Sequence, residues 1–151
     1  MSQLNDRLSQ DLKQAMIAGD KRLVSVLKGL KNALQYASVA KSESSELTDE
    51  EGLKVLQKES KKRSDAIVLY RQAGDSRRAE DEEYEKKVID KYLPEPLSKE
   101  GVLNLVEEVI NQLGDTEQKN IGKVISEVQR KSKGRAEGAL VAALVKERLA
   151  K

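Results

Sequence analysis

Apolar residues recur every three to four positions along most of the chain, which is the period of an α-helix. The first two stripes consist of Leu4, Leu8, Leu12, Ala15 and Met16, then Leu23, Leu27, Leu30, Leu34 and Ala37. The Gly19-Asp20 pair separates them, because glycine commonly ends a helix and the next can begin at Lys21. Two helices are therefore predicted before residue 41.

Two more helices are predicted before the prolines. Thr48 and Glu51 have the spacing of a capping box, in which the hydroxyl accepts from the N3 amide and the glutamate reaches back to the cap. A long helix is expected from there to about Gln72, where "AGD" stops it. A fourth helix should run from about Arg77 to Tyr92, acidic in its middle ("EDEEYE") and apolar only near its end.

Both prolines lie in "LPEPLS", residues 93–98. Proline lacks an amide donor and disfavours helix in the residue before it, so a division is predicted here. Ser98 should cap a fifth helix that Gly114 closes, and two short apolar stripes follow, at 121–128 and 140–149. We expect an all-α protein with an antiparallel four-helix bundle (residues 1–93), a linker (94–97) and a small three-helix domain (98–151).

Composition narrows the possible chemistry. The chain has no cysteine and no histidine, so disulfides, thiolate chemistry and the usual zinc, haem and imidazole-base sites are excluded. No cofactor or metal is expected. The first residues lack the apolar block of a signal peptide, and no apolar run approaches the length needed to span a membrane. A cytoplasmic protein without a membrane partner is predicted.

Several motifs that could carry chemistry are better explained by structure. The pairs Glu82-Glu83 and Glu107-Glu108 are expected on solvated helix faces, since adjacent helical residues point about 100° apart. Ser44-Ser45 has no nearby base, so no catalytic residue is predicted. The segment "KESKKR" (58–63) is expected to be solvated surface rather than an anion-binding strip. Gly29, inside the second helix, is expected where a neighbouring helix packs closely.

The segment Lys119–Arg135 differs, because it carries six basic residues and one acid, a local charge of +5 in a chain of net charge +2. Cations near a helix C-terminus with Gly134 at C′ would make an ordinary basic turn. Alternatively, helix N-termini near Asn120 and Arg135 would offer free amides beside these cations, which favours phosphate binding. Without interleaved aromatics, contact would be to phosphates and shape. The candidate residues are Lys119, Lys123, Arg130, Lys131, Lys133, Gly134, Arg135 and Gly138.

Short motifs then carry a family resemblance across essentially the whole chain. The segments "LTDEE", "KESKKRSDAI", "YLPEPLS", "NIGKVI" and "KGRAEGALV", in this order, resemble the YqeY-like family. The C-terminal part is similar to the tail of GatB, a component of the glutamine-dependent aspartyl/glutamyl-tRNA amidotransferase. The resemblance implies an all-helical fold and a tail that recognises the body of a tRNA. Glu137 stands where this family commonly has Asp, so it should cap a helix less well.

The resemblance also bears on activity. In the amidotransferase, the chemistry takes place in other domains and in a separate amidase subunit, so the family label of carbon–nitrogen ligase with glutamine as amide donor is inherited from the larger enzyme. We expect a non-catalytic accessory protein that binds tRNA or another structured RNA. Two alternatives stay open: a protein-interaction module that docks through the third helix and the acidic run Glu80–Glu85, and a partner of an amidotransferase that completes an amidation.

Overall fold

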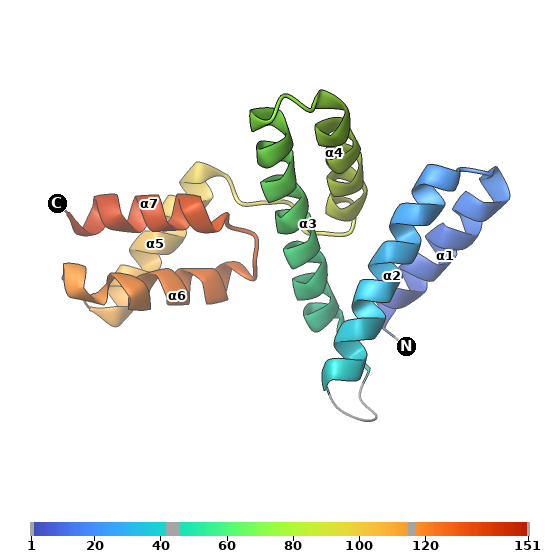
Figure 1. Cartoon of the computed structure of the whole chain (residues 1–151). Coiled ribbons are helices and arrows are strands. Elements are labelled where there is room, and N and C mark those ends of the chain that lie inside the picture. The colour runs from blue at the N-terminus through green and yellow to red at the C-terminus, as the bar shows by residue number, and fades with distance from the viewer. Residues whose placement is uncertain (1, 42–45, 115–116, 151) are drawn as a thin grey trace. The chain divides into compact units, whose positions relative to one another are not determined.

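The computed structural model describes residues 2–41, 46–114 and 117–150. Within these ranges the chain is all-α, with seven α-helices, one short 3-10 helix and no strand (Figure 1). The Ser44-Ser45 pair lies outside them. The elements are α1 (Gln3–Ala18), α2 (Lys21–Lys41), α3 (Asp49–Gln72), α4 (Ser76–Asp90), α5 (Lys99–Leu113), η1 (Gln118–Asn120), α6 (Ile121–Ser132) and α7 (Gly138–Leu149).

The chain divides into two compact units, Met1–Leu93 and Pro94–Lys151. Each unit has its own apolar core, built mainly from leucine in the first and from valine in the second. Since the sequence has no phenylalanine or tryptophan, these branched side chains must fill both cores.

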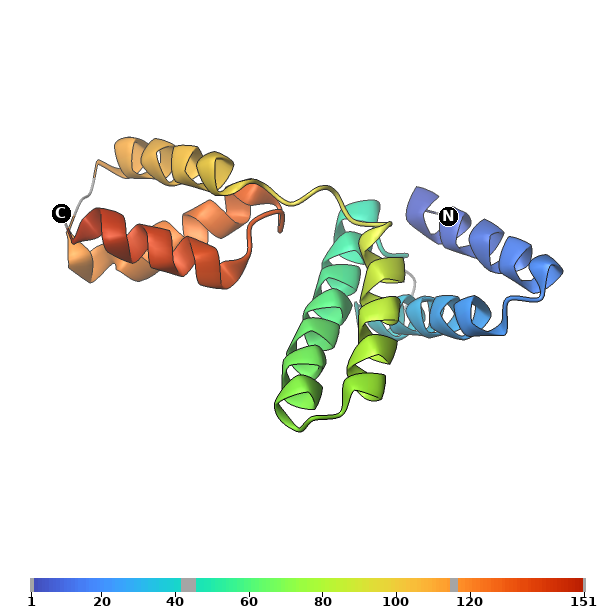
Figure 2. The same cartoon turned by 90° about the horizontal axis from the view of Figure 1, so that it is seen from above.

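The first unit consists of two helical hairpins, α1–α2 and α3–α4 (Figure 2). The first hairpin turns at Gly19, whose φ of 72° is the left-handed conformation that glycine adopts without strain. Its N–H donates to carbonyls of the last turn of α1 and so ends that helix. The α1–α2 hairpin packs on α3 and α4 through a shared core that includes Leu8, Leu27, Leu56 and Ile89.

Thr48 caps α3 as predicted, but Glu51 accepts from the Thr48 hydroxyl and not from its backbone amide. The Glu51 amide donates to Thr48 Oγ1 over 3.1 Å, and the Thr48 hydroxyl donates to the Glu51 carboxylate over 3.1 Å. The first turn also binds α1, because the Leu4 amide donates to Asp49 Oδ1 over 3.0 Å. The first turn of α3 is therefore bonded to the beginning of α1, a helix that is distant in sequence.

Close packing at a glycine occurs at Gly52, and the prediction for Gly29 is wrong. A Cβ atom placed on Gly29 would meet no atom within 4 Å, since this residue faces open space on α2. On Gly52 a Cβ atom would lie 2.8 Å from Leu4 Cδ2. The missing side chain of Gly52 leaves room for the side chain of Leu4 on α1.

The acidic run of α4 is largely paired within its own unit. Arg22 bonds Asp81 over 3.0 Å, Arg71 bonds Glu83, and Arg63 lies 2.8 Å from Glu85 and 3.5 Å from Glu82. The predicted solvated face is therefore wrong for Glu82, whose side chain is only 22% exposed. Burial, then the nearby Glu85, raises the pKa of Glu82. Arg63 likewise folds onto α4 instead of facing solvent.

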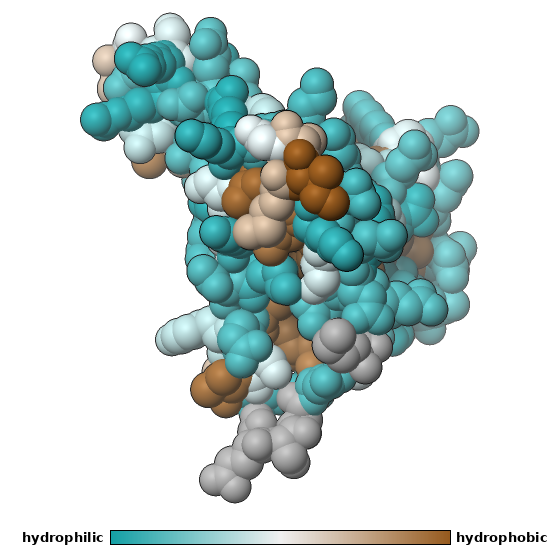
Figure 3. Space-filling view, turned by 90° about the vertical axis from the view of Figure 1, so that its right-hand side faces the viewer, coloured by the Kyte–Doolittle hydropathy of each residue, from teal (hydrophilic) through white to brown (hydrophobic). Residues whose placement is uncertain are grey.

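The face of the molecule seen in Figure 3 is mostly hydrophilic, and apolar residues break it in small groups. Large apolar residues are exposed at a few positions of the described chain: Met16, Ile17, Tyr36, Val39, Val68, Leu69 and Leu103. No helix in the described part of the chain is long and apolar enough to cross a membrane.

The second unit packs α5, α6 and α7 around a valine-rich core. Ser98 caps α5 as predicted, since its Oγ accepts from the Gly101 amide over 3.1 Å. Gly114, with a φ of 64°, ends the same helix. The buried side chains of α6 are Val124, Val128 and Ser132, a four-residue repeat on one face, so the cations of this helix must lie elsewhere around it.

Candidate nucleic-acid interface

The exposed face of α6 carries two of the predicted cations. Lys123, Glu127 and Arg130 are spaced as i, i+4 and i+7, so they form one stripe along the helix. The Nε–H of Arg130 is shared between the two carboxylate oxygens of Glu127, each 3.2 Å from Nε, and a terminal nitrogen of Arg130 donates a further bond to Glu127. The bond to Arg130 lowers the pKa of Glu127 and raises the pKa of Arg130. The charge of Arg130 is thus balanced within the stripe.

Lys131 lies on a different side of α6, toward α5. Its Nζ lies 3.4 Å from Glu108 Oε1 and also donates to Gln112 Oε1, and its side chain is only 20% exposed. Adjacent residues on a helix point about 100° apart, which separates Lys131 from Arg130. The six cations of the segment therefore do not share one face.

The N-terminal end of α6 matches the prediction. The helix begins at Ile121 with Asn120 as its N-cap, and no side-chain bond caps it. Lys119, in η1, is ion-paired with Glu117 over 2.9 Å. Lys123 lies in the first turn of α6, close to this helix start.

The C-terminal end of α6 leads into an exposed turn that holds three of the candidates together. Lys133 and Gly134 both have left-handed backbones, with φ of 53° and 78°. Gly134 thus occupies the predicted C′ position, and Lys133 is the one residue other than glycine with a positive φ in the described ranges. Arg135 follows directly, so Gly134 has a basic residue on either side of it in the sequence.

Arg135 is held in place by the segment that precedes α5. Its Nε donates to the Glu95 carbonyl over 2.8 Å, and its own carbonyl accepts from the Leu97 amide over 2.7 Å. The first bond anchors the guanidinium and the second anchors the backbone of Arg135 at the edge of the second unit. The sequence separation is about forty residues, so no local pattern could indicate this contact.

The last helix begins later than predicted. It starts at Gly138, not near Arg135, because Lys133 and Gly134 are left-handed and Glu137 is extended. Glu137 makes no side-chain cap bond, as expected for the longer acid. The first amides of α7 are therefore not capped by a side chain, and they follow the cations of the turn. A Cβ atom on Gly138 would lie 3.4 Å from Gln129 Nε2, so its close neighbour is that side chain.

Together these contacts divide the candidate residues among separate places on the second unit. Lys119, Arg130 and Lys131 are each paired with an acid. The second unit as a whole holds ten basic and nine acidic residues, so it is nearly neutral. Lys133, Gly134, Arg135 and Gly138 lie together at one end of α6, whereas Lys123 lies about 15 Å away along the helix axis. The turn from Lys133 to Gly138 brings two cations together with the start of α7, so it is the candidate anion-binding part.

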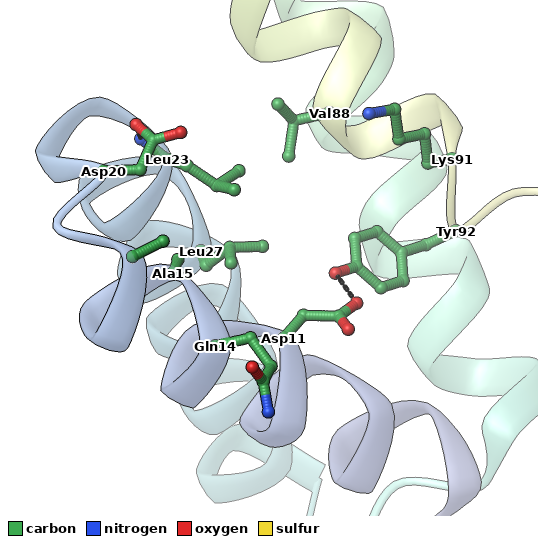
Figure 4. Close-up of a pocket in the computed structure, with 10 residues that line it drawn as sticks. Asp11, Gln14, Ala15, Asp20, Leu23, Leu27, Val88, Lys91 and Tyr92 are labelled. Carbon is green, nitrogen blue, oxygen red and sulfur yellow. Dashed lines mark hydrogen bonds between the residues drawn. The ribbon is translucent and has the colours of Figure 1, made fainter.

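The first unit contains a cavity of about 370 Å³ that the sequence did not indicate. Ala15, Leu23, Leu27 and Val88 supply apolar walls, and the Tyr92 hydroxyl donates to Asp11 at its edge (Figure 4). Burial and then this hydrogen bond raise the pKa of Tyr92. The partners are 81 residues apart, so spacing could not have revealed them.

The fold and site define an all-helical protein whose candidate binding feature is a basic, glycine-containing turn between the last two helices. The family model described as Yqey-like protein matches residues 5–149. The chain therefore belongs to the YqeY-like family, and the resemblance seen in its motifs is confirmed. A search of curated proteins gave no match.

Proposed function

We propose that this protein is a non-catalytic helical accessory protein that binds tRNA or another structured RNA through the turn Lys133–Gly138. Family membership supports the likeness to the amidotransferase tail. The observation that carries the proposal is the convergence in one exposed turn of Lys133, Arg135 and the start of α7, where no side chain caps the amides.

Phosphate is the ligand chemistry that fits this turn. Amides at a helix N-terminus carry partial positive charge and point at an incoming anion. A guanidinium adds parallel donors suited to phosphate oxygens. Since Arg135 is held by the Glu95 carbonyl through Nε, its orientation is fixed before RNA binds. Lys123 adds charge farther along α6, where a long polyanion could reach it.

The protein-interaction alternative stays a second candidate, with weaker support from the acidic run that suggested it. It rested on the acidic run of α4, and three of those acids pair with arginines of α2 and α3 in the same unit: Asp81, Glu83 and Glu85. Each arginine offsets part of the negative charge that this run would present to a basic partner.

The experiment compares charge-reversal variants in binding to fluorescently labelled tRNA, measured by anisotropy at low salt. Lys133→Glu with Arg135→Glu should weaken binding at least about tenfold, because two phosphate contacts become repulsive. Because Arg135 also supports the turn, Lys123→Glu with Lys133→Glu provides a second variant that leaves that anchor intact.

The matched control reverses the same number of charges on the first unit, at the exposed residues Lys13 and Lys87. This control should lower affinity far less, although it changes the net charge equally. Equal losses in the turn variants and in the control would mean that the affinity for RNA depends only on the total charge of the protein. Unchanged affinity in both turn variants would reject the proposed surface. Circular dichroism checks that each variant stays helical.

A further inference from the structure

A groove of about 360 Å³ lies beside the basic turn, between α5 and the C-terminal end of α6. Lys131 and Arg135, both candidate residues, line it together with Leu97, Asn104 and Leu105. We propose that this groove receives one unpaired nucleotide of the bound RNA, with the phosphate on Arg135 and the base beside Asn104. The inference rests on the proposed function and adds which part of an RNA is recognised.

Arg135 provides the phosphate contact at the edge of the groove. Its Nε is occupied by the Glu95 carbonyl, and no hydrogen bond of its terminal amino groups occurs within the described residues. The backbone bond from the Leu97 amide to the Arg135 carbonyl holds the same residue from the other side. A guanidinium fixed in this way presents its remaining donors outward with little conformational entropy to lose.

Apolar walls make the groove suited to more than a phosphate. Leu97 and Leu105 are half-buried and pack against the core of the second unit. An anion alone gains nothing from leucine side chains, whereas the faces of a base are apolar and gain from leaving water. Contact with leucine would bury the base without the aromatic stacking that this sequence cannot provide.

Besides the carboxylate of Glu108 and the two cations, the polar lining offers one amide for the edge of the base. The Ser132 hydroxyl is buried and donates to the Gln129 carbonyl over 3.0 Å, and Lys131 is held by Glu108 and Gln112. Asn104 is exposed, and its side-chain carboxamide makes no hydrogen bond within the described part of the chain. A carboxamide offers both donors and an acceptor, which matches the edge of a nucleobase.

An unpaired nucleotide fits better than a duplex. In a helix of RNA the base edges are paired and the faces are stacked, so neither could enter a groove between two protein helices. A loop or bulge exposes both. The groove therefore predicts preference for RNA with unpaired residues, in addition to the charge-driven binding of any RNA.

The test uses the full chain and two RNAs with the same stem, a hairpin whose loop carries 2-aminopurine and a blunt duplex without unpaired residues. The wild type should bind the hairpin more tightly than the duplex, and 2-aminopurine fluorescence should change on binding. Asn104→Ala should weaken hairpin binding about threefold to tenfold, the loss expected from one hydrogen bond, and leave duplex binding unchanged.

Asn111→Ala is the matched control, since this residue is exposed on the same face of α5 two turns farther along and does not line the groove. Asn111→Ala should leave the affinities for the hairpin and for the duplex unchanged. Equal binding of both RNAs by the wild type, or equal losses for Asn104→Ala with both, would overturn the nucleotide site while leaving RNA binding intact. Absence of binding to either RNA would instead reject the proposed function on which this inference rests.

Discussion

Tyr92 connects the two ends of the first unit through a single side chain. Its hydroxyl donates to Asp11 on α1, and the Arg7 guanidinium lies 4.6 Å from the centre of its ring. The same arginine donates to the Lys91 carbonyl over 3.2 Å. These contacts attach α1 to the end of α4, and they place a partly buried phenol beside a carboxylate.

Replacing Tyr92 by phenylalanine should lower the free energy of unfolding by about 1 kcal/mol near pH 8, since one part-buried hydrogen bond is lost. Because the pKa of Tyr92 is raised in the folded protein, the unfolded chain loses this proton first. The tyrosine's contribution is therefore complete below the unfolded pKa of about 10 and declines as pH rises above it.

Urea unfolding of wild type and Tyr92→Phe from pH 8 to 11 measures this effect. The difference between them should shrink above pH 10. The 81% exposed Tyr36 gives the control, and Tyr36→Phe should follow the wild type at every pH. A constant difference for Tyr92→Phe would mean that the phenol titrates alike in both states.

The two glycines of the first hairpin and α3 give a second residue-scale prediction. Gly29→Ala should stabilise the protein by about 0.5–1 kcal/mol, since alanine is the better helix former and its methyl group meets open space. Gly52→Ala should stabilise the protein clearly less than Gly29→Ala does, or destabilise it, because the added methyl group would press on Leu4. Thermal unfolding of both variants checks this, and equal gains would show that α1 does not need the space.

At the scale of elements, the N-cap residues Ser98 and Glu137 stand where α5 and α7 begin. Ser98→Ala removes a hydrogen-bonded cap from α5 and should cost about 1 kcal/mol. Glu137→Asp should instead stabilise α7, by a few tenths to about 1 kcal/mol, because the shorter acid can reach the amides that Glu137 leaves uncapped. Denaturant unfolding measures both. A loss of stability on Glu137→Asp would contradict this account of the helix start.

These signals also explain how much the sequence could predict. The caps at Thr48 and Ser98 and the glycines at 19, 114 and 134 act within a few residues, so the helices were predictable to within one or two residues at most ends. The start of α7 was missed because Lys133 takes a left-handed backbone, which is rare for lysine and has no sequence signal.

The candidate site was predictable only as a set of charges. Which cations are balanced depends on acids from other elements, such as Glu108 on α5 for Lys131, and these become neighbours only in the fold. The Glu95 bond to Arg135 and the groove at Asn104 arise in the same way. An apolar pattern with a helical period indicates which face of one helix is buried, but it does not indicate which helix packs against that face.

At the scale of the whole molecule, the separate cores suggest that each unit unfolds on its own. Val106→Ala, at a fully buried position in the second unit, should cost that unit about 2 kcal/mol, and Leu56→Ala should destabilise the first by at least as much. Thermal unfolding followed by circular dichroism should show two transitions, each lowered by one of the variants. A single transition shifted by both would show that the units unfold together.

The salt dependence of tRNA affinity tests the central claim most directly, because it counts the phosphates that the protein neutralises. For the wild type, the logarithm of the association constant should fall linearly with the logarithm of salt concentration. Lys133→Gln with Arg135→Gln should reduce the slope by about 1.4–1.8, or 0.7–0.9 for each phosphate that is no longer neutralised. Lys13→Gln with Lys87→Gln should leave it unchanged. An unaltered slope in the turn variant would contradict the assignment of this turn as the RNA-binding surface.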